Sequence, residues 1–172
     1  MNYTRLSSFI ACALLVSACG SDSHDDGGEV TPPPVVPTIH IDKAANIELE
    51  LTRFDGVSGA LSFTLSDNTQ QAITQAKDYN IIYFGFPEES SGINNPKSWQ
   101  RWHLTNSYSC NTQENECEGL LSESDIKGSY TFEAPDLDWT QGDSAKLVQK
   151  YKVAIEIKGA LSSNEVDLLP PL

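Results

Sequence analysis

The sequence predicts an all-β protein, a single antiparallel β-sandwich, and three observations carry this prediction. Short segments alternate apolar and polar residues with a period of two, as expected for strands with one face in a core. Turn-forming pairs such as Asp55-Gly56 and Asp67-Asn68 separate these segments. Few stretches show a helical period. The predicted domain, residues 38–172, is long enough to form one hydrophobic core.

The first two strands show the alternation most clearly. In the first, Ile47, Leu49 and Leu51 alternate with polar residues, and in the second Leu61, Phe63 and Leu65 alternate with serine and threonine. Residues 70–77 are polar and lack a clear period. A short helical turn is therefore left open for them.

The remaining strands are predicted from composition and spacing. The segment from Tyr79 to Phe86 is too continuously apolar for a half-exposed strand and is predicted to run through the middle of the core. After a loop from Pro87 to Pro96, further strands are expected at residues 99–105, 129–133 and 149–158. Six or seven short strands in all indicate an immunoglobulin-like or Greek-key sandwich.

The chain begins with a segment typical of export. Arg5 is followed by an apolar run, residues 6–16, which is shorter than a membrane-spanning helix requires, and then by Ser17, Ala18 and Cys19. This ending resembles the lipobox of bacterial lipoproteins, which implies that residues 1–18 are removed and that Cys19 is acylated. The alternative is an ordinary secretory signal followed by a chance cysteine. Gly20 after the cysteine favours the outer membrane, so we expect a lipid-anchored protein at the cell surface.

Residues 19–37 are predicted to form a tether between the anchor and the domain. After Cys19 they are rich in serine, aspartate and glycine and contain almost no apolar side chain before Val30. Four prolines follow at positions 32–34 and 37. Such a segment cannot bury enough apolar surface to fold, and its prolines favour an extended chain. We therefore expect a disordered spacer.

The charge of the chain excludes some partners. The net charge is −13, with 24 acidic residues against 11 basic ones. Nucleic-acid binding requires clustered lysine and arginine, so no nucleic-acid partner is expected. Anionic lipid head groups should repel the chain, so the lipid on Cys19 is expected to provide the contact with the membrane.

The four cysteines have different predicted fates. Cys12 lies in the signal segment and Cys19 is the lipidation site, which leaves Cys110 and Cys117 in the exported domain. An even pair in an oxidising compartment predicts a disulfide. Two alternatives stay open: a metal site with His103 as a third ligand, and a redox-active pair.

The sequence contains no catalytic motif that we can identify, so we predict no catalytic residue, no metal and no enzyme activity. Three aromatic residues are candidate exposed contacts for a sugar, a quinone or a flavin: Trp99, Trp102 and Tyr108. The two tryptophans have opposite strand parity, so at most one of them faces the core. One core tryptophan beside one exposed aromatic residue is the simpler interpretation. Acidic residues near Trp139 offer a calcium alternative to a solvated loop; they are Asp136, Asp138 and Asp143.

Several short sequence words in the domain resemble a known family. They are a Ser-Asp-Asn turn at residues 66–68, Tyr-Phe-Gly-Phe-Pro-Glu at 83–88, Asn-Pro-Lys-Ser-Trp-Gln at 95–100 and Gly-Ser-Tyr-Thr-Phe at 128–132. Together with the lipobox and the acidic spacer, they resemble the N-terminal β domain of the outer-membrane decahaem c-type cytochromes, the OmcA/MtrC family. The resemblance implies a lipid-anchored Greek-key β domain next to haem domains that pass electrons out of the cell.

The chain departs from that family in its cofactor chemistry. No C-x-x-C-H motif occurs, so covalent haem is not expected within these residues and would be expected only in a continuation beyond Leu172. A fragment, a truncated gene and a domain that works alone stay open. The sequence thus predicts a haemless surface lipoprotein domain with a structural or docking role, with outer-membrane electron-transfer proteins as expected partners. The alternative is a recognition or adhesion module that binds glycan or protein.

Overall fold

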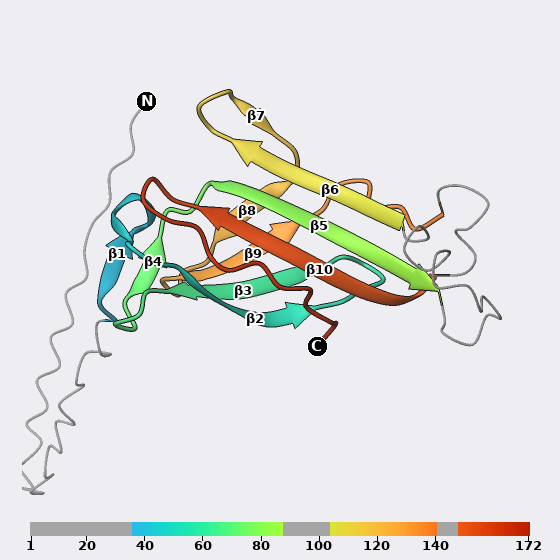
Figure 1. The fold of residues 1–172 in the computed structure, drawn as a ribbon, viewed down its shortest axis with the longest axis horizontal. Coiled ribbons are helices and arrows are strands. Elements are labelled where there is room, and N and C mark those ends of the chain that lie inside the picture. Colours follow the sequence, from blue (N-terminus) through green and yellow to red (C-terminus); the bar gives the residue numbers. More distant parts are fainter. Residues whose placement is uncertain (1–35, 88–103, 141–147) are drawn as a thin grey trace, which may run out of the picture. The chain divides into compact units, whose positions relative to one another are not determined.

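Two β-sheets face each other in the structure, a computed structural model that describes residues 36–87, 104–140 and 148–172 (Figure 1). This confirms the prediction of an all-β sandwich. The described strands are β1 (Thr38–His40), β2 (Glu48–Phe54), β3 (Leu61–Ser66), β4 (Ala72–Thr74), β5 (Asp78–Pro87), β6 (Leu104–Asn111), β7 (Glu116–Cys117), β8 (Leu120–Glu123), β9 (Ser129–Glu133) and β10 (Val148–Lys158). One 3-10 turn, η1 (Ile41–Lys43), follows β1, and no described helix is long and apolar enough to cross a membrane.

The first sheet is built around β3. Its strand order is β1-β4-β3-β9-β8, and β2 pairs with the other edge of β3. The β2–β3 ladder runs from Glu48↔Ser66 to Phe54↔Leu61, with an irregularity between Leu51 and Arg53. The pairing of β1 with β4 is parallel, whereas the other strand pairings in the described ranges are antiparallel, as predicted. A strand that enters from the N-terminal segment can pair in either direction, because no tight turn joins it to its partner.

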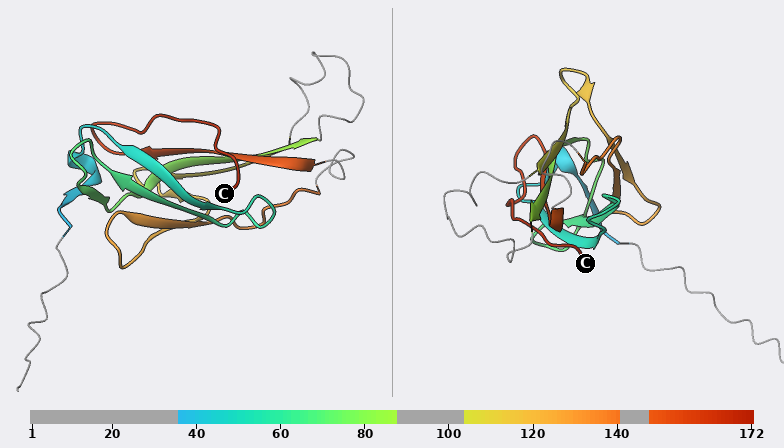
Figure 2. Two further views of the ribbon diagram at one scale, coloured as in Figure 1. Left: turned by 90° about the horizontal axis from the view of Figure 1, so that it is seen from below. Right: turned by 90° about the vertical axis from the view of Figure 1, so that its right-hand side faces the viewer.

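The second sheet has the order β10-β5-β6-β7, and all its pairings are antiparallel. The last strand returns to pair with β5 over ten residue pairs, from Val148↔Pro87 to Lys158↔Asp78. Figure 2 shows the two sheets as separate layers, with the β6–β7 hairpin projecting from one side.

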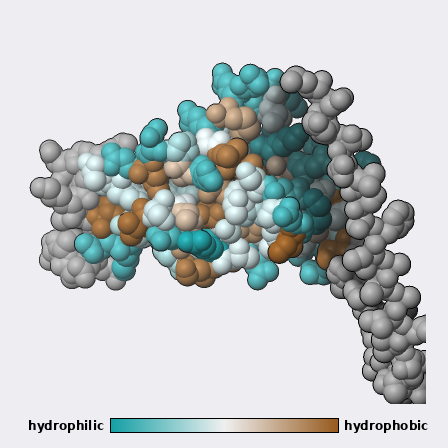
Figure 3. Space-filling model, turned by 180° about the vertical axis from the view of Figure 1, so that it is seen from behind, coloured by the Kyte–Doolittle hydropathy of each residue, from teal (hydrophilic) through white to brown (hydrophobic). Residues whose placement is uncertain are grey.

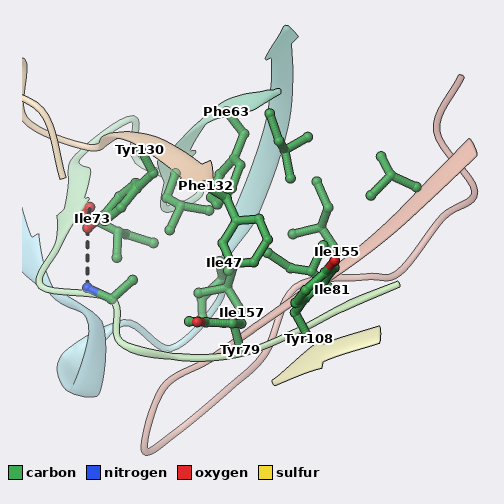
Figure 4. Close-up of a cluster of buried hydrophobic side chains, with 14 of the residues drawn as sticks. Ile47, Phe63, Ile73, Tyr79, Ile81, Tyr108, Tyr130, Phe132, Ile155 and Ile157 are labelled. Atoms are coloured by element: carbon green, nitrogen blue, oxygen red, sulfur yellow. Dashed lines mark hydrogen bonds between the residues drawn. The ribbon is translucent and has the colours of Figure 1, made fainter. Parts of the chain in front are cut away.

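Side chains from both sheets meet in one hydrophobic core (Figure 4). Phe63, Tyr130 and Phe132 come from β3 and β9, and Ile81 and Ile155 come from β5 and β10. The alternation predicted for residues 61–65 is confirmed, since Leu61, Phe63 and Leu65 are buried. Burying side chains of this size stabilises the fold by about 1.5–3 kcal/mol each.

Three predicted elements differ from the observed ones. Residues 72–74 form the short strand β4, not a helical turn, because β1 and the end of β3 offer them backbone partners. The structure has a strand, β6, that begins at Leu104, where the sequence predicted one at 99–105. The extent of β6 was missed because its outward residues Thr105, Ser107 and Ser109 alternate with few apolar ones. Residues 99–103 lie outside the described ranges. On β5 only one face is buried, so the strand is central in its sheet but not enclosed on both sides.

Candidate functional site

Several predicted site residues lie outside the described residues: Cys19, Trp99, Trp102, His103 and Asp143. The lipid anchor and the two tryptophan contacts therefore stay predictions. The described surface mixes hydrophilic and hydrophobic side chains without one large apolar patch on the face seen in Figure 3.

The predicted disulfide between Cys110 and Cys117 is present in the structure. The two cysteines are direct cross-strand partners in the β6–β7 ladder, next to the pair Asn111↔Glu116. The hairpin they close carries Asn115 with a φ of 57°, a conformation that asparagine tolerates better than most residues. The bond therefore closes a short polar hairpin at the edge of the second sheet.

Tyr108 is not an exposed contact residue, which corrects that part of the aromatic prediction. Only 7% of Tyr108 is exposed, and its ring packs edge-on against Tyr83 and Phe132 at centroid distances of 5.9 and 5.7 Å. Its hydroxyl donates a hydrogen bond to the carbonyl of Pro135. Tyr108 lies on the inward face of β6 and is the one buried residue of that strand, so it belongs to the core.

The described members of the acidic cluster near Trp139 hold their own turn. Asp138 accepts hydrogen bonds from the backbone and hydroxyl of Thr140, and these bonds lower the pKa of its carboxyl. Asp136 has a φ of 53° and is exposed. Within the described ranges, no three His, Cys, Asp or Glu side chains are placed to hold a metal ion.

A polar cavity of about 240 Å³ lies where β1 and η1 meet the second sheet. Four chain segments line it, and the lining residues are His40, Ile41, Asp42, Gln75, Lys77, Asp78, Thr112 and Lys158. Two carboxylates and two ammonium groups face the same space, so the cavity suits small polar solutes better than a single strongly charged ion.

Both ring nitrogens of His40 are already used in that cavity. Nδ1 accepts the backbone N–H of Asp42 at 3.2 Å, so in the neutral ring Nε2 carries the proton and donates it to Oε1 of Gln75, also at 3.2 Å. Asp42 in turn accepts the backbone N–H of Ala160. His40 therefore caps η1 and joins β1 to the loop after β4, and it is not a free base.

The tyrosines with shifted pKa values lie in the core. Burial raises the pKa of Tyr130 to about 12, and burial also raises the pKa of Tyr83. Tyr130 donates to the carbonyl of Ile73 at 2.9 Å and accepts the N–H of Ala76, while Tyr83 donates to the carbonyl of Gly59 at 2.9 Å. These hydroxyls satisfy backbone groups, which is a structural use.

Sequence reasoning missed the role of Trp139. Its ring lies edge-on to Tyr151 at 5.1 Å and occupies the space where a side chain on Gly85 would be. Its Nε1 is buried and has no hydrogen-bond partner in the described part of the chain. The signal that could have found this contact is Gly85, a glycine inside a strand, which often marks the close approach of another group.

Comparison with known proteins gives one match. No protein-family model matches the chain, and no curated protein matches it. Among solved structures, the crystal structure of MtrC from Shewanella baltica OS185 is similar with a TM-score of 0.49 and 11% sequence identity; the match covers 71% of this chain and 21% of that one. At this identity and TM-score, the likeness does not extend to function or to the roles of residues.

Proposed function

We propose that this protein is a lipid-anchored β-sandwich module at the outer membrane of a bacterium, with a structural or docking role beside electron-transfer proteins. The observation that carries the proposal is the order of three parts in the sequence: a lipobox that ends at Cys19, an acidic and proline-rich spacer, and a β-sandwich whose first strand starts at Thr38. This order suits a domain held at a distance from a membrane surface.

The buried polar groups support a structural role over catalysis. Asp67 and Asn164 are the buried polar side chains among the described residues. Asp67 accepts two backbone N–H groups and one hydroxyl within its own turn, and Asn164 bonds to backbone groups of β10 and of its neighbour Glu165. Both side chains hold the fold together and neither lines the polar cavity.

The proposed relation to the decahaem cytochromes rests on the four short sequence words at residues 66–68, 83–88, 95–100 and 128–132. In the described ranges these words fall on turns and core positions: Asp67 holds the β3–β4 turn, and Tyr130 and Phe132 are buried in β9. Short sequence segments shared at turn and core positions would specify a shared β domain, and none of them contains a haem-binding motif. The test is the gene itself: several C-x-x-C-H motifs encoded after Leu172 would support the relation, and a polysaccharide-related locus without them would argue against it.

The anchor is tested by Cys19→Ser in the full chain, because acylation requires the thiol. We expect the variant to leave the membrane fraction, or to stay unprocessed, while the matched control Cys12→Ser behaves like the wild type. Membrane attachment and mobility unchanged in Cys19→Ser would refute the lipoprotein proposal. Surface exposure is measured by protease treatment of intact cells, which should remove the domain.

A further inference from the structure

The residues after β10 turn back and run along the edge of that strand (Figure 1). Gly159 and Ser162 close the turn through a backbone hydrogen bond of 2.9 Å. Ser163 then pairs with Lys158, and Leu169 pairs with Val153. Val153 and Leu169 exchange two hydrogen bonds, at 2.9 and 2.8 Å, and Leu172 N–H donates to the carbonyl of Phe54 in β2. We call this segment, residues 163–172, the latch.

One side chain does much of the pairing that a strand would do. The amide of Asn164 accepts the N–H of Ile157 at 2.7 Å and donates to the carbonyls of Ile155 and Glu165 at 2.9 and 2.7 Å. Between Asn164 and Leu169 every latch residue is exposed, including Val166 and Leu168 at 48% and 49%. The latch therefore covers the edge through two short contacts with an unpaired stretch between them.

We propose that the latch covers the outer edge of β10 and thereby prevents self-association. When residues 163–172 detach, β10 pairs antiparallel with β10 of a second copy. A free strand edge presents unpaired N–H and C=O groups that readily accept another strand. The edge groups covered by the latch belong to Val153, Ile155 and Ile157. Loss of the latch would leave all three open.

The residue pattern of β10 fits a second copy. A two-fold axis at Ala154 places Val153 opposite Ile155 of the other copy, so the buried faces stay continuous. The same register places Lys152 opposite Glu156 of the other copy, twice by symmetry, and opposite charges across a ladder are stabilising. Lys150 then faces Lys158, but Lys158 already lies 3.2 Å from Glu156 in its own chain. Such an interface is closed and self-complementary.

The test begins with Asn164→Ala in the full chain, with Asp167→Asn on the exposed part of the latch as the matched control. We expect amide exchange at Ile157 to rise about tenfold or more, because its hydrogen-bond partner is lost. We also expect light scattering of the purified protein to give twice the monomer mass, while the control stays monomeric.

A charge reversal then tests whether the strand that pairs with β10 is β10 of a second copy. In the Asn164→Ala background, Lys152→Glu should abolish the dimer, and adding Glu156→Lys should restore it. A cysteine at the axis, Ala154→Cys, should crosslink between copies several-fold more than with an intact latch, since non-hydrogen-bonded partners lie close together.

Three outcomes would overturn the proposal: faster exchange at Ile157 with no dimer, a dimer indifferent to the charge reversal, or a stable complex with a different protein in place of the dimer. If Asn164→Ala does not fold, the measurements are made on Leu169→Ala, which keeps the Asn164 amide and removes the side chain that packs on the core. Amide exchange is then measured at Val153, whose N–H donates to the Leu169 carbonyl. Faster exchange at Val153 with no dimer, a dimer indifferent to the charge reversal, or a stable complex with a different protein would then count against the proposal.

Discussion

Gly128, the residue before β9, occupies a position where the structure leaves room for glycine alone. Its φ is 78°, and a Cβ there would lie 2.8 Å from the carbonyl oxygen of Leu65 and 2.9 Å from the Cβ of Ala72. We expect Gly128→Ala to lower the free energy of unfolding by about 2–4 kcal/mol, from backbone strain and overpacking together. Urea unfolding followed by circular dichroism measures it.

Gly59→Ala is the control for that prediction. Gly59 has a similar φ of 73°, but an added Cβ would meet chiefly the side-chain end of Leu137, which can move. The backbone penalty alone, about 1–2 kcal/mol, is expected there. Equal losses in the two variants would contradict the role given to the backbone contact at Gly128.

The core tyrosines set how stability depends on pH in alkali. Burial raises the pKa of Tyr130 from an ordinary value of 10.0 to about 12. Above pH 10 the unfolded chain releases this proton more readily than the folded chain, so the free energy of unfolding falls as pH rises from 10 to 12. Below pH 10 this contribution is fully present. Unfolding curves at several pH values, with tyrosinate absorbance as a second signal, measure the loss.

Tyr130→Phe provides the comparison, because it removes the titrating hydroxyl. Its overall stability should be lower by about 1–3 kcal/mol, since the backbone groups of Ile73 and Ala76 lose their partner. Its decline between pH 10 and 12 should nevertheless be shallower than in the wild type. A variant with the same decline would assign the alkaline sensitivity to other groups.

At the scale of elements, the disulfide is a brace for the β6–β7 hairpin. Two cross-strand residue pairs join β7 to β6, and one of them is Cys110↔Cys117. Closing an eight-residue loop should stabilise the chain by about 2.5 kcal/mol. We expect Cys110→Ser with Cys117→Ser to melt at a lower temperature with the β fold retained, and chemical reduction of the wild type to give the same shift. Two free thiols in freshly exported, denatured protein would favour the redox alternative instead.

Strands with regular alternation were predictable, and the short or polar ones were not. Leu61, Phe63 and Leu65 reveal β3 because each inward side chain is apolar and each outward one is polar. β4 and β7 depend on partners far away in the sequence, and no local pattern shows that Ala72 pairs with Thr38. Tyr108 was a candidate exposed contact, and a single aromatic residue among polar ones does not show which face of a strand it occupies. Tertiary contacts decide such positions.

The candidate site residues divide in the same way, into those that a sequence pattern predicts and those that depend on distant parts of the chain. The pairing of Cys110 with Cys117 could be predicted because an oxidising compartment and an even count leave few options. The cavity around His40 could not, because its lining comes from four segments between positions 40 and 158. Asn164 gave no signal either, since an asparagine near the end of a chain is ordinarily interpreted as a turn residue.

At the scale of the whole molecule, the net charge of −13 separates two ways of holding the chain to a membrane. A protein bound through basic residues leaves anionic lipid when salt screens the attraction, whereas an acyl anchor is held by apolar burial. Removal of residues 1–18 takes away one further positive charge, Arg5. We therefore expect washing with about 1 M salt, where the screening length is about 3 Å, to release none of the wild-type protein from membranes.

The same reasoning fixes what the unanchored chain should do. Cys19→Ser protein should not sediment with anionic lipid vesicles at low salt, where repulsion between the acidic chain and the lipid is strongest, and added salt should not improve its binding. Release of the wild type by salt, or binding of the variant to anionic vesicles, would show an electrostatic contact that the acidic composition argues against. Because screening weakens charge interactions and leaves the acyl chain in place, the two measurements together separate lipid anchoring from surface attraction.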